Sequence, residues 1–168
     1  MLMLDPQPLS DATFAPFGHV ISGSSDSGRP INHGSSRRVD VPGTLDLQAQ
    51  DGHPVLAVFR AQAQAPQGPW HELERHRLGS QSFVPLQGAR CIVLVALGEH
   101  APDPTTLAAF VVVGHQGFTL NAGTWHHPLI ALDDGDFVVL ERQGAAVDCE
   151  VQHLADPVTL RCDGLTLR

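Results

Sequence analysis

The 168-residue chain contains no lysine and no tyrosine, so all ten of its basic residues are arginines. Enzymes that form a Schiff base on lysine, or that use tyrosine as their acid or base, are therefore excluded. Aromatic residues are scarce at 5%, and 18 acidic residues give a formal net charge of −8. Because nucleic acids and anionic membranes attract clustered basic residues, this balance argues against both as partners.

Cysteine is also rare, with Cys91, Cys149 and Cys162 as its three occurrences. An odd number at wide spacing resembles neither a disulfide framework nor a zinc finger. No apolar run approaches the length of a membrane span. The N-terminus lacks a basic segment and soon reaches Asp5 and Pro6, so we expect no signal peptide and a cytoplasmic protein.

Glycine and proline, by contrast, are frequent, with 16 and 13 residues. Glycines separate short apolar segments rich in β-branched residues, a pattern typical of an all-β sandwich or barrel. Strands are expected over residues 55–60, 81–86, 90–97, 110–113, 117–120, 127–132 and 137–142. A chain of this length can bury one sizeable core, so residues 1–168 are predicted to form a single domain.

Three further segments have a local pattern of their own. Ser10 is a good N-cap, and Phe14 and Phe17 follow on one helical face, which predicts a single short helix. The Gly/Ser/Asp stretch over residues 22–28 predicts a loop. Residues 103–110 fit either a helical turn or the beginning of a strand.

The segment from His71 to His76 superficially resembles the helical zincin signature, which needs two histidines four residues apart. Here the gap is five residues, which turns the second histidine about 140° around a helix and off the shared face. On a strand, the period of two places Glu72, Glu74 and His76 on one face and Arg75 on the other. Glu74 and His76 are therefore predicted to project together into a pocket.

Two segments resemble the metal-binding motifs of the cupin superfamily. The first cupin motif is Gly, five residues, His-x-His, three or four residues, Glu, six residues, Gly. Its intervals fit residues 68–88, with Glu74 in place of the first His, His76 as the second and Gln81 in place of the Glu. The second includes Pro-x-Gly, two residues, His, and its intervals fit residues 121–126, with Asn121 in place of the Pro and His126 as the ligand. The resemblance implies an all-β, cupin-like double-stranded β-helix (jelly roll), here with the short N-terminal helix.

The four side chains at these positions, Glu74, His76, Gln81 and His126, offer one carboxylate, two imidazoles and one amide oxygen. Such a set suits Ni²⁺, Mn²⁺, Fe²⁺ or Zn²⁺ without selecting among them. Gln is an uncommon ligand, so orienting a water or the substrate is the alternative role of Gln81. A scaffold that keeps its polar residues but has lost its metal is the alternative for the whole set. Of the pair His126 and His127, only one can face inward, and the cupin spacing selects His126.

An acidic protein that binds a small carboxylate needs a fixed cation, and arginine offers a bidentate fork. Arg60, at the end of an expected strand, is the first candidate, and Arg142 is the second. For both, the alternative is a surface ion pair with Asp136 or Glu141.

Residues 71–86, 114–129 and 136–142 resemble the signature segments of the ureidoglycolate lyases, once called ureidoglycolate hydrolases. The combination of Glu74-Arg75-His76 with Trp125-His126-His127-Pro128 is the most specific part, and the resemblance covers nearly the whole chain. Ile31-Asn32-His33-Gly34 resembles the Ile-Asn-x-Gly segment of this family, which adds Asn32 to the candidate substrate-binding residues.

The resemblance implies a lyase of allantoin and purine breakdown that cleaves the carbon–nitrogen bond of ureidoglycolate to glyoxylate and urea. A divalent metal (Ni, Mn or Zn) chelated by the substrate's hydroxyl and carboxylate would act as a Lewis acid, and a general base would remove the hydroxyl proton. Glu74 and a metal-bound hydroxide are the alternative bases, and no organic cofactor is needed. The expected catalytic residues are Glu74, His76 and His126, and the expected substrate-binding residues are Arg60, Gln81, Asn32 and Arg142.

Two other functions stay open from the sequence alone. One is another metal-dependent cupin, such as a dioxygenase or isomerase, that acts on a small hydroxy or keto acid. The other is a non-catalytic cupin that binds a small acid. In each case we expect a homodimer, because jelly-roll sheets expose edges that commonly pair.

Overall fold

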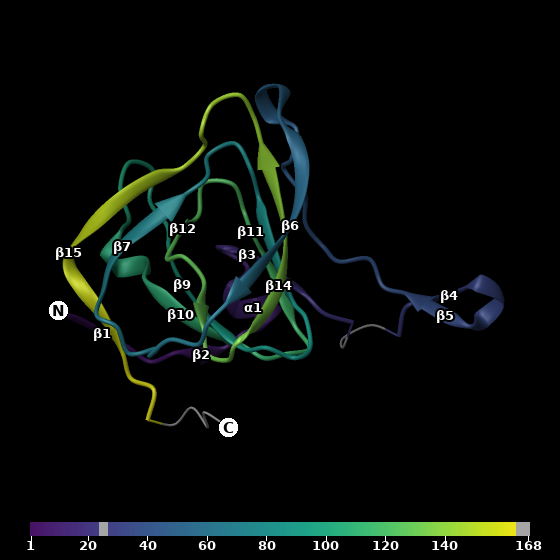
Figure 1. Cartoon of the computed structure of the whole chain (residues 1–168), viewed down its shortest axis with the longest axis horizontal. Coiled ribbons are helices and arrows are strands. Elements are labelled where there is room, and N and C mark those ends of the chain that lie inside the picture. The colour runs from purple at the N-terminus through teal and green to yellow at the C-terminus, as the bar shows by residue number, and fades with distance from the viewer. Residues whose placement is uncertain (24–26, 164–168) are drawn as a thin grey trace.

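The computed structural model describes residues 1–23 and 27–163, and it consists mainly of β-strands, as predicted. Two curled sheets form a half-barrel, consistent with a cupin-like fold (Figure 1). The larger sheet has eight strands in the order β1-β15-β7-β12-β9-β10-β2, with β13 beside β9. The smaller sheet has five strands in the order β3-β11-β8-β14-β6.

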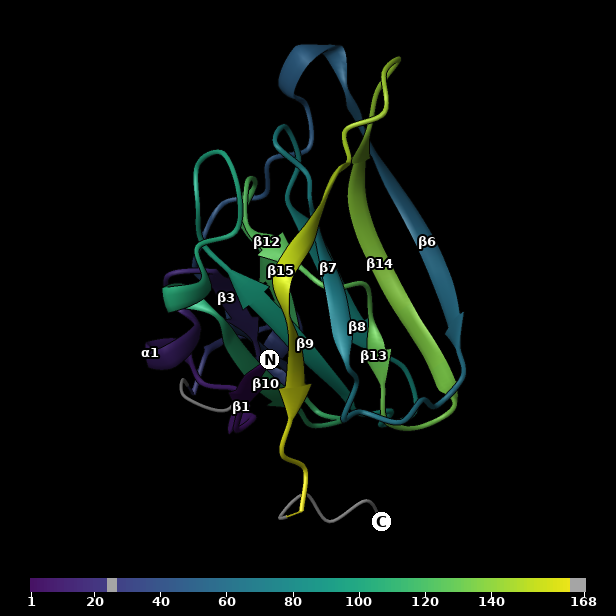
Figure 2. The same cartoon turned by 90° about the vertical axis from the view of Figure 1, so that its left-hand side faces the viewer.

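The strands of the larger sheet are β1 (Leu2–Leu4), β2 (Gln7–Pro8), β7 (Trp70–Arg75), β9 (Cys91–Ala96), β10 (Ala108–Val112), β12 (Trp125–His126), β13 (Ile130–Ala131) and β15 (Glu150–Leu160). Those of the smaller sheet are β3 (Gly18–Ile21), β6 (His53–Ala61), β8 (Gln81–Pro85), β11 (Gly117–Leu120) and β14 (Gly135–Gln143). β14 and β6 are antiparallel neighbours and run together along one side of the molecule (Figure 2). No helix in the described ranges is long and apolar enough to cross a membrane.

Strand β9 lies between two hydrophobic clusters, which explains why all six of its residues are buried. The odd-numbered residues from Cys91 to Val95 face the first cluster, between the two sheets. The even-numbered residues from Ile92 to Ala96 face a second cluster on the other side of the larger sheet. Because both faces are covered, the strand has a continuous apolar run instead of an alternating pattern. Burial also raises the pKa of the Cys91 thiol to about 12.

The predicted short helix is present as α1 (Asp11–Phe14), with the Ser10 side chain accepting a hydrogen bond from the backbone N–H of Thr13. Phe14 is buried and packs edge-on against Phe110 at a ring-centroid distance of 5.3 Å. The ambiguous segment contains both expected forms, because the 3₁₀ helix η3 (Pro104–Thr106) is followed closely by β10. Of the strand expected over 127–132, only Ile130 and Ala131 form a strand, β13, and the residues before it include Pro128, which lacks a backbone N–H.

A separate hairpin arm, defined as residues 29–38, projects away from the half-barrel (Figure 1). It consists of β4 (Arg29–Ile31), the 3₁₀ turn η1 (Asn32–Gly34) and β5 (Ser36–Arg38), and β4 and β5 form a two-stranded sheet of their own. The sequence did not predict this hairpin. Of the loop predicted over 22–28, residues 24–26 lie outside the described residues.

Candidate active site

Glu74 and His126 are brought together by neighbouring strands of the larger sheet. In the antiparallel pair of β7 and β12, His126 lies directly opposite Glu74. The preceding residues, Leu73 and Trp125, are fully buried in the second hydrophobic cluster. By the period of two, Glu74 and His126 point the opposite way, into the space between the two sheets.

His76 completes a cluster with these two residues. It follows directly after β7, and its ring centroid lies 5.3 Å from that of His126. Oε1 of Glu74 lies 3.5 Å from Nε2 of His126. One ligand atom from each of Glu74, His76 and His126 lies within 4.8 Å of the others, so this cluster could hold a metal ion.

The orientation of both imidazoles is fixed by backbone carbonyl groups. Nδ1 of His76 lies 2.5 Å from the carbonyl oxygen of Asp148, and Nδ1 of His126 lies 3.0 Å from that of Thr124. Because a carbonyl oxygen can only accept, each Nδ1 carries the proton and each Nε2 presents its lone pair. Both Nε2 atoms are buried and have no hydrogen-bond partner among the described residues. This is how metal-binding histidines are commonly held, so the donor set fits a divalent metal.

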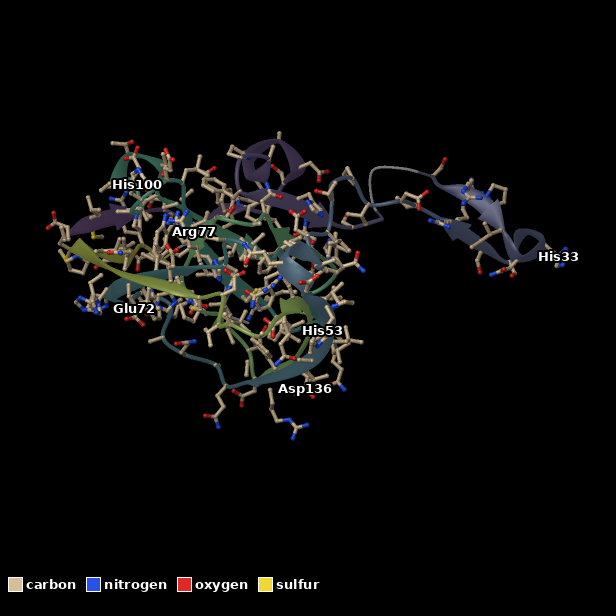
Figure 3. The ribbon with its side chains drawn as sticks, turned by 90° about the horizontal axis from the view of Figure 1, so that it is seen from above. His33, His53, Glu72, Arg77, His100 and Asp136 are labelled. Atoms are coloured by element: carbon tan, nitrogen blue, oxygen red, sulfur yellow. The ribbon has the colours of Figure 1, made fainter. Side chains whose placement is uncertain are left out.

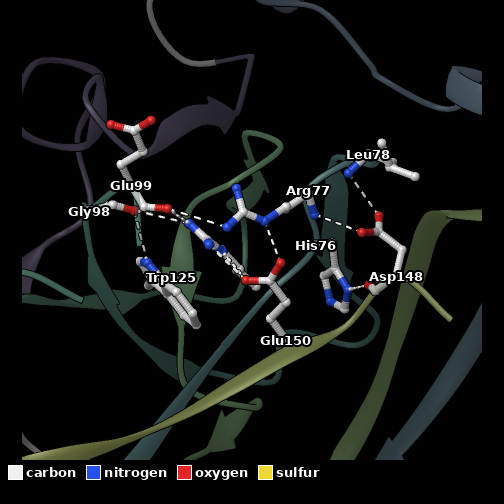
Figure 4. A network of polar contacts seen from close by, with 9 residues as sticks. His76, Arg77, Leu78, Gly98, Glu99, Trp125, Asp148 and Glu150 are labelled. Carbon is white, nitrogen blue, oxygen red and sulfur yellow. Dashed lines mark hydrogen bonds and ion pairs between the residues drawn. The ribbon is translucent and has the colours of Figure 1, made fainter. Parts of the chain in front are cut away.

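The carbonyl that holds His76 is itself anchored. The Asp148 carboxylate accepts hydrogen bonds from the backbone N–H groups of Arg77, at 2.8 Å, and Leu78, at 2.9 Å (Figure 4). A second anchor comes from Gly123, whose backbone N–H donates to the carbonyl oxygen of His76 at 2.7 Å. Gly123 has a φ of +86°, a conformation that favours glycine. Through this hydrogen bond, the glycine of the second cupin motif joins that motif to the first.

Gln81 reaches the same pocket from β8 in the smaller sheet. Its Nε2 donates to Oε2 of Glu141 at 2.8 Å, which fixes the orientation of the amide. Its Oε1 is buried and has no hydrogen-bond partner in the described part of the chain. Together with Glu74 and His126, Gln81 lines a cavity of about 420 Å³. The amide oxygen is therefore presented to the pocket as a further oxygen donor.

The pKa of Glu74 lies below its usual value, first because of its contact with the His126 imidazole, whose Nε2 lies 3.5 Å from Oε1 of Glu74, and then because of the charges of His126 and His76. Nε2 of His126 is also the nitrogen that would bind a metal ion. A proton and a metal ion compete for this position, and either positive charge keeps Glu74 ionised.

Cys149 is a neighbour of the cluster that the sequence analysis did not find. Its Sγ lies 3.6 Å from Oε2 of Glu74. Burial and the charge of Glu74 raise the pKa of the Cys149 thiol, so it remains protonated near neutral pH. Cys149 immediately precedes β15, a strand that was also not predicted.

Comparison with known proteins agrees with this geometry. A sequence model of the ureidoglycolate lyases matches residues 1–161. The chain belongs to the ureidoglycolate lyase family. It is 40% identical to the ureidoglycolate lyase of Azotobacter vinelandii over 151 residues, which are 89% of this chain and 91% of the relative. It is 39% identical to that of Burkholderia mallei over 166 residues, 98% of this chain and 97% of the relative. For Stutzerimonas stutzeri the identity is 35% over 164 residues, with coverages of 97% and 96%.

In this member of the ureidoglycolate lyase family, Arg60 does not join the buried cluster. It lines the cavity at its rim, but its side chain is 85% exposed and its Nε lies 3.2 Å from Oδ1 of Asp136. Asp136 is opposite Arg60 in the β14–β6 pair, and the fully buried Phe137 is opposite Phe59. Because side chains alternate along a strand, Phe59 faces inward and Arg60 faces outward. The surface ion pair, the alternative considered from the sequence, is the observed arrangement.

Arg142 and Asn32 are also placed outside the cluster. Nε of Arg142 donates to the carbonyl oxygen of Ala49 at 2.7 Å, and its Nη2 donates to that of Gln50 at 3.3 Å. These bonds hold the 3₁₀ turn η2 (Ala49–Asp51), so Arg142 supports a loop. Asn32 lies in the turn of the hairpin arm, next to His33, which Figure 3 labels at the far end of the arm. The structure therefore groups four of the predicted residues and places three outside the group. The four are Glu74, His76, Gln81 and His126, and the three are Arg60, Arg142 and Asn32.

Proposed function

We propose that the protein is a ureidoglycolate lyase, which cleaves ureidoglycolate to glyoxylate and urea in the cytoplasm. The observation that carries this proposal is the pair of unpaired Nε2 atoms of His76 and His126, which converge with Glu74 and Gln81 in a member of this family. The relatives named above are ureidoglycolate lyases that match nearly the whole chain. Neither the dioxygenase or isomerase interpretation nor the non-catalytic one gains support from these relatives.

The pocket is suited to a divalent metal held by His76 Nε2, His126 Nε2, the Glu74 carboxylate and the Gln81 amide oxygen. These donors are of borderline to hard character, which suits Ni²⁺, Mn²⁺, Fe²⁺ or Zn²⁺. When bound, such an ion supplies Lewis-acid stabilisation of the oxygen that becomes the carbonyl of glyoxylate. No organic cofactor takes part in the proposed reaction.

Glu74 is the proposed general base. Its lowered pKa keeps it ionised, so it can accept the proton of the substrate's hydroxyl group. The oxygen's electron pair then forms the carbonyl, the carbon–nitrogen bond breaks, and the departing nitrogen takes up a proton to give urea. Gln64 lines the cavity and donates its amide N–H to the carbonyl oxygen of Leu129, which leaves its own amide oxygen to accept from the ureido group.

Urea release from racemic ureidoglycolate, compared with the buffer rate, tests this function. We expect release that is abolished by a chelator and restored by adding back one divalent metal, which elemental analysis of the purified protein should identify. Gln81→Ala should lower kcat or metal content, because the amide oxygen points into the site. Urea release at the buffer rate would overturn the proposal, and full activity in metal-free protein would overturn the role of the metal.

Arg60→Ala is expected to have a small effect, even though the sequence made Arg60 the first candidate for the carboxylate. An exposed ion pair in water contributes at most about 1 kcal/mol, and the side chain of Arg60 is 85% exposed. We therefore expect KM to rise by less than about fivefold with kcat unchanged. Steady-state kinetics at two salt concentrations would check this, and a loss of kcat would contradict it.

A further inference from the structure

We propose that the hairpin arm of one copy covers the active-site pocket of a second copy and brings Arg29 to the substrate's carboxylate. This inference rests on the proposed function, because it assigns the cation that an anionic substrate requires. Catalysis would then require the expected homodimer, because each site is incomplete until the partner's arm is in place.

The conformation of the arm does not depend on packing against the half-barrel of its own chain. Its side chains from Asn32 to Arg38 are all exposed. Its form is nevertheless defined, because the Arg37 guanidinium donates to the carbonyl oxygens of Ser27 and Gly28. Asn32 and His33 have φ angles of +51° and +55°, a conformation that asparagine and histidine adopt more readily than most other residues with a side chain. Because a two-stranded hairpin is marginally stable on its own, a partner that packs against the arm would stabilise it.

Charge favours a second copy of this chain as that partner. The arm carries three of the ten arginines, Arg29, Arg37 and Arg38, and none of the 18 acidic residues. The rest of the chain is correspondingly more acidic than its net charge of −8. Beside the residues that line the cavity, Asp134 accepts a hydrogen bond from the backbone N–H of Ala63, and Asp136 in β14 pairs with Arg60. A basic arm and an acidic rim are complementary between two copies of one chain.

Among the described residues, no arginine faces the cavity from the inside. Arg60 faces outward and is paired with Asp136, while Glu74 contributes a negative charge to the cavity. The side chain of Arg29, by contrast, is exposed and has no hydrogen bond or ion pair among the described residues. Within residues 1–23 and 27–163, one chain therefore has an unpaired arginine side chain on its arm and an anion site without an inward-facing arginine.

The outer face of the smaller sheet gives the second copy a surface to cover. Leu56 is 71% exposed and Val58 is 56% exposed there, beside an apolar groove of about 370 Å³ lined by Leu56, Val84 and Leu140, among others. β6 is an edge strand of this sheet, and its last residues, Phe59 to Ala61, line the active-site cavity. A chain that covers this face therefore reaches the rim of the cavity. In a two-fold dimer the contact is reciprocal, so each copy's arm serves the other copy's site.

Mixed dimers test whether the arm acts on the partner. Arg29→Ala alone should lower kcat/KM at least about tenfold, mainly through KM, because a charge-assisted contact is lost. Arg161→Ala is the matched control, since Arg161 is an exposed arginine paired with Asp5. We expect heterodimers of Arg29→Ala and His126→Ala chains, purified through two different tags, to regain about half of the wild-type activity per dimer. Activity no higher than that of the two variants measured apart would overturn the proposal.

A second measurement does not use the substrate. It therefore distinguishes failure of the arm contact from failure of the proposed lyase activity. Trypsin cleaves after arginine in this lysine-free chain, and the bonds after Arg37 and Arg38 are exposed in a single copy. We expect these bonds to resist trypsin where light scattering reports a dimer, and to be cleaved after dilution to the monomer. Leu56→Asp should give a monomer with a cleaved arm, whereas Val147→Asp, at a 90% exposed site, should not. A monomeric wild type, or a dimer whose arm is cleaved as fast as that of the monomer, would overturn the proposal.

Discussion

His126→Ala is expected to lower kcat/KM for ureidoglycolate by at least about a hundredfold, because loss of a partner that merely orients a ligand already costs ten- to a hundredfold. His126 is 3% exposed, and its Nε2 converges on the site with Glu74 and His76. Its removal deletes a donor from the cluster without breaking a strand, so the circular dichroism spectrum should be unchanged. Elemental analysis should show a loss of bound metal in the same variant.

His127→Ala is the matched control for this prediction. The ring of His127 lies 4.5 Å from that of Trp70, and its Nδ1 lies 2.8 Å from the carbonyl oxygen of Pro128. His127 therefore packs away from the cluster, and we expect its replacement to change kcat/KM by less than about fivefold, or 1 kcal/mol. Equal losses in both variants, with unchanged circular dichroism, would contradict the inward and outward assignment of the two histidines.

Arg75→Ala is expected to lower the free energy of unfolding by about 3 kcal/mol, because a buried cation and its partners are lost together. The side chain of Arg75 is 2% exposed, and its Nη2 donates to Glu150 at 2.7 Å. Its Nη1 donates to the carbonyl oxygens of Gly98, at 3.1 Å, and Glu99, at 2.7 Å. Its guanidinium carbon lies 4.2 Å from the ring centroid of Trp125. Figure 4 shows the partners Glu150 and Trp125 in this network.

Thermal unfolding followed by calorimetry checks this expectation. For a chain of 168 residues, the loss corresponds to a fall in Tm of about 6–12 °C. Arg75→Lys should recover part of the loss, because it keeps the charge but not the planar fork. Arg161→Ala, which breaks an exposed ion pair with Asp5, should change Tm little. An unchanged Tm in Arg75→Ala would show that the network does not contribute to stability.

Much of the fold and of the cluster could be predicted because it depends on local spacing. The period of two separates Glu74 from Arg75, and the structure has Glu74 lining the cavity and Arg75 in the network on the other side. The apolar segments expected as strands correspond to observed strands, and Ser10 begins the helix. These features follow from each residue's own neighbours in the chain.

Other features had no local signal. β15 is rich in polar residues and exposed over much of its first half, so it lacks the apolar pattern by which strands are recognised. Its pairing with β7 is what brings Cys149 and the Asp148 carbonyl beside the cluster. The position of Arg60 depended on the register between β6 and β14, and a shift of one residue would have turned it inward.

The sequence by itself determined the all-β class, the family and the spacing that brings Glu74, His76 and His126 together, because spacing and residue type are properties of the chain. Only the tertiary structure decided which nitrogen of each histidine faces the pocket. The carbonyl groups of Asp148 and Thr124 set this orientation, and that of Asp148 comes from a distant part of the chain. It also decided that Arg60 pairs with Asp136 and that Asn32 lies on a projecting arm. The physical reason is that strand register and hydrogen bonds between distant segments orient polar side chains, and neither is encoded in local periodicity.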